Sequence, residues 1–438
     1  MAAKHWAMAG MVAASLVAWG AAKADPIPPG WQGDKVEPIG FSGLEGRFGA
    51  FKLAIKHGAD NRWYLYMGHS FDHGWTILDV TDPTDPKFVR FIPGPSDATT
   101  SQVTLNGNLM LTATDRGENP KEGASAVWLW DISEPANPRK LSEWVGGVNG
   151  SHRDSYPGGK YAYLATSMPG YEGKVMVILD VSDPLHPVQA GLWSQPGQKQ
   201  GEPKPKLAPG FHGPANVSPD GKMISTGYTP DVVNLDIADP AHPKLIGSLT
   251  MTPPFIYAGA QSVHTVLPLW DRKLLYASSE AMATGCDKDA LNFAAFIDNR
   301  DPAKPRLTSM FPVPRPPKDA PYKDFCQKGG RFGPHNVSQE IHNPDIQKYG
   351  NLMYIAYFNA GLRVFDISDP QLVTETGWFM PPERPDAPPT AGNHASPIEW
   401  TEDVAVDARG NIYISEDKWG IFVLRYKGPV PPATAAAK

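Results

Sequence analysis

Cysteine is scarce in this sequence, with 2 residues among 438 and no CxxC pair. This scarcity argues against a zinc or copper centre built from clustered thiolates. A basic excess is also missing, because 40 Lys and Arg stand against 46 Asp and Glu, giving a net charge of −6. Without a basic block, a nucleic-acid partner is not expected.

Several short catalytic motifs are absent as well. The chain has no G-x-S-x-G elbow, no Walker A loop, no H-E-x-x-H pair and no EF-hand loop. The nucleotide-hydrolysing, zincin and EF-hand classes therefore have no support from motifs. Any chemistry has to come from residues that the fold brings together.

Long hydrophobic runs are missing apart from one apolar stretch near the start, residues 8–19. It follows Lys4 and precedes Ala22-Lys23-Ala24, the small-x-small pattern of a signal-peptide cleavage site. It is shorter than the roughly 20 residues that a membrane span needs. We therefore expect a signal peptide over 1–24 and a periplasmic or secreted protein without an integral membrane segment after cleavage; an uncleaved anchor is the weaker alternative. In an oxidising compartment Cys286 and Cys326 are expected to form a disulfide.

Turn-forming residues, in contrast, are abundant. The chain contains 46 prolines and 42 glycines, yet 41% of it is hydrophobic. Proline at this density breaks long helices, and the apolar content is too high for a disordered chain. Many short segments joined by turns indicate an all-β fold.

A hexapeptide recurs six times along the chain. Each copy ends an apolar run and is followed by further apolar residues, so it predicts a strand, a turn and a strand, with Asp accepting hydrogen bonds from the turn backbone. Two more strand-like segments precede the copies, which gives four antiparallel strands per unit, typical of a propeller blade. The copies are LDVTDP (78–83), WDISEP (130–135), LDVSDP (179–184), LDIADP (235–240), IDNRDP (297–302) and FDISDP (365–370).

The C-terminal part supplies a seventh unit that is one strand short. Its strands are expected in 402–407, 411–417 and 420–426, and the N-terminal stretch 36–43 can complete it. Pairing the two chain ends would leave no open sheet edge. We predict a seven-bladed β-propeller of four-stranded antiparallel blades, forming a single domain over 25–438.

On these repeats the sequence resembles the LVIVD-repeat proteins, predicted β-propellers of bacterial exported proteins. The resemblance spans nearly the whole chain after residue 24, and it is strongest in 351–370, 333–340 and 403–426. It implies the fold but little about activity, because propellers include enzymes, scaffolds and binding proteins.

Four histidines stand near the start of the first strand expected in blades 3 to 6: His152, His212, His264 and His335. Equivalent positions in successive blades point to one end of the central channel, where imidazoles could bind Fe or Cu, with Zn or Ca as alternatives. The competing interpretation is that each histidine tethers its blade to a neighbour. His186 and His242 lie in D-P-x-H-P turns and are expected at the surface.

Three charged residues are candidates for catalytic roles. Glu280 and Glu340 are expected at the same level as the histidines, as general bases or as partners of the imidazoles. Arg363 lies in an apolar strand and could hold a substrate carboxylate. For Asp154 and Glu402 we expect only a salt bridge or a turn cap.

Insertions break the blade spacing and are expected to cover the face that bears the histidines. Their aromatic side chains could line a pocket for an apolar ligand, or could only shield the channel mouth. These aromatic residues are Phe255, Tyr257, Tyr322, Phe325 and Phe332.

Two functional hypotheses follow. The first is an exported metal-dependent enzyme, an oxidoreductase or oxygenase acting on a small organic substrate, aromatic ones included, with metal-assisted hydrolysis or lyase chemistry as the second choice. The other hypothesis is a non-catalytic propeller that binds a ligand or an envelope protein, with the histidines as tethers.

Overall fold

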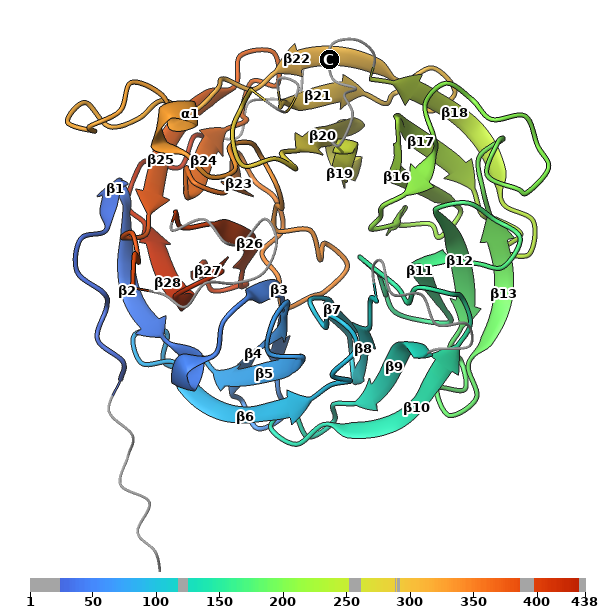
Figure 1. Cartoon of the computed structure of the whole chain (residues 1–438), viewed down its shortest axis with the longest axis horizontal. Coiled ribbons are helices and arrows are strands. Elements are labelled where there is room, and N and C mark those ends of the chain that lie inside the picture. The colour runs from blue at the N-terminus through green and yellow to red at the C-terminus, as the bar shows by residue number, and fades with distance from the viewer. Residues whose placement is uncertain are drawn as a thin grey trace, which may run out of the picture.

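The computed structural model describes residues 24–116, 125–251, 261–287, 289, 292–386 and 398–432. Seven antiparallel sheets surround a central channel as the blades of a propeller (Figure 1). Helical structure in the described residues is confined to η1 (Leu44–Gly46), η2 (Trp270–Arg272) and α1 (Phe325–Lys328). None of these helices has the length and apolar character that crossing a bilayer requires. The predicted all-β, seven-bladed fold is confirmed.

The blades follow one another in chain order. Within each blade the strands are ordered from the channel outward. Blades 1 and 2 consist of β3 (Ala50–His57), β4 (Trp63–His69), β5 (Gly74–Asp79) and β6 (Lys87–Pro93), then β7 (Val103–Asn106), β8 (Leu109–Ala113), β9 (Ser125–Asp131) and β10 (Arg139–Val145). Blades 3 and 4 consist of β11 (Tyr161–Ser167), β12 (Lys174–Asp180) and β13 (Val188–Trp193), then β14 (Gly210–Phe211), β15 (Asn216–Val217), β16 (Met223–Thr229), β17 (Asp231–Asp236) and β18 (Lys244–Thr250). Blades 5, 6 and 7 consist of β19 (Gln261–Leu269), β20 (Leu274–Glu280), β21 (Ala294–Asp298) and β22 (Arg306–Met310), then β23 (Leu352–Ala356), β24 (Leu362–Asp366) and β25 (Thr374–Met380), then β26 (Thr401–Val406), β27 (Ile412–Glu416) and β28 (Gly420–Tyr426).

The two chain ends meet in the ring, as predicted. Strand β2 (Val36–Ser42) pairs antiparallel with β28 and becomes the outer strand of blade 7. A second contribution was not predicted: β1 (Gln32–Asp34) pairs antiparallel with β25 and completes blade 6. The N-terminal segment thus covers the edges of two neighbouring blades, which would otherwise expose unpaired backbone groups.

The hexapeptide turns form as the sequence predicts. In each copy the aspartate that ends the third strand accepts a hydrogen bond from the backbone N–H two residues later, at 2.8–3.0 Å. This local bond stops the strand and turns the chain toward the outer strand. His186 and His242 lie in these turns with exposed side chains, each beside the aspartate three residues before it.

In blades 3 and 6 the innermost strand is reduced to isolated bridges. Ser151 and Ser155 each bridge to β11, and Val337 bridges to β23. Beyond Val337 the chain leaves its own blade and crosses the channel, where the side chain of Asn343 donates to the backbone oxygen of Ile55 in blade 1 at 2.7 Å. The orange segment that runs across the centre of Figure 1 is this crossing.

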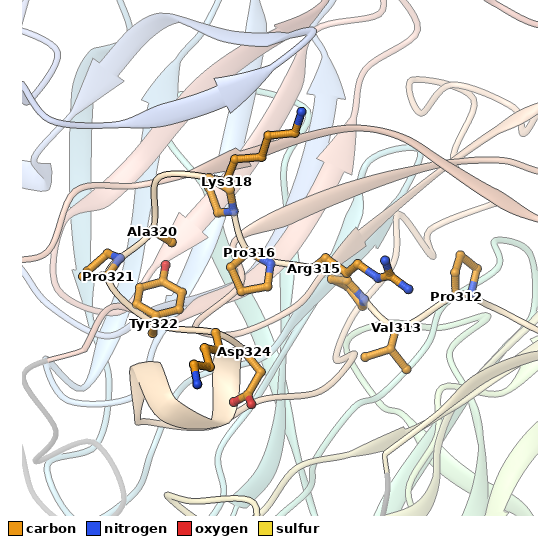
Figure 2. Close-up of a pocket in the computed structure, with 12 residues that line it drawn as sticks. Pro312, Val313, Arg315, Pro316, Lys318, Ala320, Pro321, Tyr322 and Asp324 are labelled. Atoms are coloured by element: carbon orange, nitrogen blue, oxygen red, sulfur yellow. The ribbon is translucent and has the colours of Figure 1, made fainter.

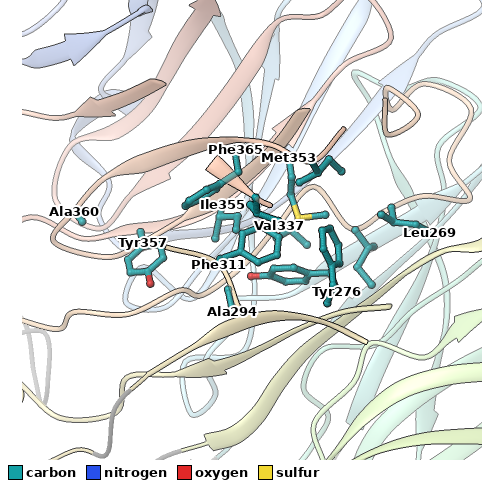
Figure 3. Packing of buried hydrophobic residues seen from close by; sticks show 14 of the residues in the cluster. Leu269, Tyr276, Ala294, Phe311, Val337, Met353, Ile355, Tyr357, Ala360 and Phe365 are labelled. Atoms are coloured by element: carbon teal, nitrogen blue, oxygen red, sulfur yellow. The ribbon is translucent and has the colours of Figure 1, made fainter. Parts of the chain in front are cut away.

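Apolar side chains fill the spaces between adjacent blades. Between blades 5 and 6, Phe311 packs against Tyr276, Phe296 and Phe365, with ring centroids 4.9–5.5 Å apart (Figure 3). Similar clusters lie between the other six pairs of neighbouring blades. These contacts make the blades a rigid frame, so side chains near the axis are held in fixed positions.

Candidate functional site

The four predicted histidines meet at one end of the channel. His264 lies in β19, His212 lies between β14 and β15, and His152 and His335 stand beside the bridges of blades 3 and 6. The ring centroids are 5.2 Å apart for His152 and His212, 4.4 Å for His212 and His264, and 4.7 Å for His264 and His335. The imidazoles therefore form a continuous arc across four consecutive blades.

Glu280 lies beside this arc because β20 ends at the same level. Its Oε2 is 3.3 Å from Nε2 of His264, and its Oε1 is 3.7 Å from Nε2 of His335. Arg331 forms an ion pair with the same carboxylate and donates from Nε to the backbone oxygen of Ala281 at 2.6 Å. Its guanidinium stacks on the ring of Phe358. Arg331 thus holds Glu280 in one place beside the histidines.

The hydrogen bonds of His335 and His264 determine which ring nitrogen carries the proton. Nδ1 of His335 lies 2.6 Å from the backbone oxygen of Glu402, which can only accept, so Nδ1 is the protonated nitrogen. The hydroxyl of Thr265 donates its single proton to the backbone oxygen of His335, and it therefore accepts from Nδ1 of His264 at 2.8 Å. In both rings Nε2 is left with a lone pair facing Glu280.

His212 adds a third imidazole, whose buried Nε2 has no hydrogen-bond partner among the described residues. Ligand atoms of His212, His264 and Glu280 all lie within 4.8 Å of one another. A lone pair beside a carboxylate oxygen is repulsive unless a cation lies between them. Two ligands bound tetrahedrally at about 2.1 Å are about 3.4 Å apart, close to the separations between Glu280 and the histidines. The site therefore fits a metal ion.

Arg153 reaches across the channel below the imidazoles. Its Nη1 is 3.0 Å from Nδ1 and 3.1 Å from Nε2 of His264. An atom almost equally far from both nitrogens lies over the face of the ring, so it does not occupy the lone pair of Nε2. The backbone of Arg153 has a left-handed φ of 56°, which costs energy in a residue other than glycine.

Burial keeps the imidazoles neutral. The pKa values of His212 and His264 are well below the usual range, first because of burial and then because of the nearby charge of Arg153. Burial also lowers the pKa of His335, and Arg331 acts in the same direction. Neutral imidazole is the form that binds iron, copper or zinc.

His152, the fourth predicted ligand, has a different environment. Its Nδ1 is 3.3 Å from Asp115, whose carboxylate also pairs with Lys174 at 2.5 Å. Its side chain is 23% exposed, whereas those of His264 and His335 are 2% and 3% exposed. His152 therefore stands at the open edge of the arc.

The structure does not bring Glu340 and Arg363 to the histidines. Glu340 lies on the segment that crosses the channel, where Thr104 donates to it at 2.9 Å and Lys52 lies 3.9 Å away. Arg363 lies on β24, the third strand of blade 6, and pairs with Glu375 at 3.0 Å. The sequence did not reveal that the chain crosses the channel after Val337, and an arginine on a third strand is too far from the axis to reach the site.

Glu402 and Asp154 were expected to form a salt bridge or to cap a turn, and their surroundings differ from this expectation. Glu402 has no cationic partner among the described residues but lies beside His335, with Oε2 3.3 Å from Nδ1. Asp154 accepts from the Ser151 hydroxyl and from the backbone N–H of Ala165 in β11, so it links the segment before β11 to that strand.

The predicted disulfide between Cys286 and Cys326 is present, with the two Cα atoms 5.6 Å apart. It joins the segment after Glu280 to the segment before Arg331. A pocket of about 280 Å³ lies beside it, lined in part by Phe332 and Tyr357.

The insertion aromatics contribute to packing more than to an open pocket. Tyr322, Phe325 and Phe332 pack against the core between blades 5 and 6, whereas Phe255 and Tyr257 lie outside the described residues. A larger hollow of about 1000 Å³ follows the proline-rich segment 312–324 and is lined by that segment alone (Figure 2). It is separate from the histidine arc.

A family model described as the LVIVD repeat matches residues 158–193 and 343–380. These residues form most of blades 3 and 6. The chain is thus a β-propeller that carries LVIVD repeats in these two blades. The matched range 343–380 includes the stretch 351–370 on which the resemblance was strongest, whereas 333–340 and 403–426 lie outside the match.

Solved structures of similar fold are propellers as well. A protein from Lactobacillus plantarum aligns with a TM-score of 0.51 at 12% identity, covering 84% of this chain and 98% of that one. The periplasmic gluconolactonase PpgL of Pseudomonas aeruginosa aligns with a TM-score of 0.53 at 11% identity, covering 85% and 99%. At these identities the likeness shows the fold alone. No curated protein sequence matches the chain.

Proposed function

We propose that this LVIVD-repeat propeller is a metal-dependent oxidoreductase that acts on a small organic substrate at the histidine arc. The observation that carries the proposal is that Nε2 of His264 and Nε2 of His335 face the carboxylate of Glu280, while a ring nitrogen of His212 lies within 4.8 Å of ligand atoms of His264 and Glu280. Two or more imidazoles with one carboxylate form the donor set of non-haem iron oxygenases. An iron or copper ion held there would supply the redox chemistry.

The residues around this donor set support the proposal through what each one does. Thr265 and the backbone of Glu402 accept from Nδ1 of His264 and His335, which orients both rings. Arg331 holds Glu280 toward the rings. Phe358 stacks on His335 and restricts water on that side. His152, at the exposed edge, is the histidine that an entering substrate meets first.

The interpretation of the histidines as tethers between blades accounts for only one of the two nitrogens of each ring. Nδ1 of His335 does join blade 6 to blade 7 through Glu402. A tether, however, needs one ring nitrogen, whereas Nε2 of His264 and Nε2 of His335 both face the carboxylate of Glu280. Ion binding uses the nitrogens that tethering leaves over.

Metal analysis tests the proposal directly. Protein purified from its native export compartment should contain about one equivalent of iron or copper, and His212→Ala and His264→Ala should each lose it. His186→Ala and His242→Ala are matched controls, because these histidines are exposed in turns at the rim, and they should keep the metal. A parent protein without stoichiometric metal would contradict the proposal.

The type of reaction needs its own assay, because the same donor set can support metal-assisted hydrolysis. One structurally similar propeller is named as a gluconolactonase. Loaded protein should consume oxygen or a chemical oxidant with aromatic and aliphatic test substrates, and it should leave gluconolactone unchanged. Lactone hydrolysis that disappears in His264→Ala would instead assign the site to the hydrolases.

The proposed cellular location is the periplasm or the exterior, after cleavage behind Ala24. N-terminal sequencing of protein from the export compartment should begin at Asp25. In the structure the Asp25 carboxylate accepts from the backbone N–H of Gly43 at 2.9 Å, so the chain is anchored from this residue onward.

A further inference from the structure

Arg153 is a buried cation whose direct hydrogen-bond partners are all uncharged. The residue is 3% exposed. Among the described residues, no carboxylate lies within 4.0 Å of its guanidinium. Its acceptors are the backbone oxygen of His264 at 2.7 Å, the Thr265 hydroxyl at 3.0 Å, the Asn336 amide oxygen at 3.1 Å and the Gln339 amide oxygen at 2.8 Å.

The carboxylates around Arg153 are engaged with other cations. Glu280 pairs with Arg331, and Asp403 pairs with Lys52 at 3.2 Å. The positive charge of Arg153 therefore has no counter-ion of its own in the described part of the chain. A buried charge without a partner is costly, and the cost falls when an ion of opposite sign binds nearby.

The guanidinium also has one N–H donor that is available to a ligand. Nη1 donates to the backbone oxygen of His264, and Nη2 faces the three side-chain oxygens of Thr265, Asn336 and Gln339, whereas no described acceptor lies on Nε–H. The backbone strain at Arg153, with a φ of 56°, is matched at Phe358, with a φ of 44°, on the other side of the arc. Strained residues of this kind persist where a functional arrangement requires them.

We infer that the ligand of this channel end carries an anionic oxygen group, and specifically that it is a small organic carboxylate attracted by Arg153. The inference rests on the proposed function in one respect, that this ligand would be the substrate. Access is from the side of His152 and His212, the two partly exposed members of the arc. Arg153 thus takes the role that the sequence suggested for Arg363.

A metal ion would strengthen the preference for an anion. A dication bound by neutral imidazoles and Glu280 adds positive charge to a site where Glu280 is already paired with Arg331. Charge-assisted hydrogen bonds to a carboxylate are about twice as strong as neutral ones. A neutral ligand of the same shape does not gain the additional strength of a charge-assisted hydrogen bond.

The test compares isosteric ligands by calorimetry. Benzoate and benzamide, with acetate and inorganic phosphate, are titrated into metal-free protein and, separately, into protein loaded with its metal. Benzoate should bind about tenfold or more tightly than benzamide in both preparations. Equal affinities would overturn the inference, and tighter binding of phosphate than of benzoate would overturn the carboxylate class. Because the titration of metal-free protein needs no ion, a failure of the metal proposal can be told apart from a failure of this inference.

Variants assign the preference to Arg153. Arg153→Met should reduce the benzoate preference about tenfold or more, while Arg139→Met, at an exposed rim position, should keep it. Circular dichroism and thermal unfolding check that each variant is folded. If Arg153→Met does not fold, Arg153→Lys retains the charge and should retain the preference for benzoate. Loss of the preference in a folded Lys variant would contradict the role of the charge.

Discussion

The imidazole of His335 donates from Nδ1 to the backbone oxygen of Glu402, 2.6 Å away in the neighbouring blade. This one bond joins blade 6 to blade 7 and turns Nε2 of His335 toward Glu280. A contact that holds the ring together therefore also prepares a ligand atom. His264 has the same double role. Its Nδ1 donates to the Thr265 hydroxyl, which in turn donates to the backbone oxygen of His335 in the next blade.

Thr265→Val removes the acceptor that holds Nδ1 of His264. We expect metal affinity to fall by about 10- to 100-fold, the usual cost of losing a residue that orients a ligand. Affinity is measured by competition with a chelator of known strength. Thr84→Val, in an exposed turn where the hydroxyl contacts only Asp82, is the control and should not change it. Unchanged affinity in the Thr265 variant would show that the tautomer of His264 does not need this bond.

Arg331→Met leaves Glu280 buried without its ion-pair partner. Breaking a buried pair in this way costs about 3 kcal/mol or more of the free energy of unfolding. Urea unfolding followed by fluorescence measures the loss. Arg139→Met, which breaks an exposed pair with Asp131, should leave the midpoint almost unchanged. Similar midpoints for both variants would mean that Arg331 does not stabilise the site.

Much of the architecture could be predicted because it depends on local chemistry. The Asp of each hexapeptide turns its own backbone, so the position of the third strand in a blade could be found without tertiary information. The closure by β2 followed from counting strands. The pairing of β1 with blade 6 could not be predicted, because its three residues are all exposed and have no apolar pattern.

The site was only partly predictable, for a physical reason. The histidines share a position relative to their turns, which is a regular spacing that the sequence displays. Arg331 lies in an irregular insertion, and Arg153 depends on a left-handed backbone, so neither is marked by spacing. Glu340 shows the reverse error: its place near a strand start suggested the site, but the chain crosses the channel after Val337 and carries it away.

Removing the disulfide by Cys286→Ser with Cys326→Ser should destabilise the fold. The bridge closes a loop of 40 residues, and the loss of chain entropy in the unfolded state corresponds to about 4 kcal/mol. Unfolding by urea, with and without reductant, measures the effect. Reductant should lower the midpoint of the parent protein to that of the double variant and should not affect the variant. A parent midpoint insensitive to complete reduction would contradict this.

The stability of the protein should also depend on the titration of Glu399. Burial raises the pKa of this carboxyl to about 8, and the nearby Lys418 only partly opposes the effect. Between about pH 4.5 and pH 8 the folded state therefore holds a proton that the unfolded state has released, so the free energy of unfolding falls as the pH rises through this range. Glu399→Gln removes this dependence, and its advantage over the parent should grow with pH toward an upper limit of about 4 kcal/mol near pH 8. Glu172→Gln, at an exposed position paired with Lys204, should follow the parent at every pH. Parallel curves for the parent and Glu399→Gln, measured by urea unfolding from pH 5 to pH 8, would show that Glu399 is ionised in the folded protein.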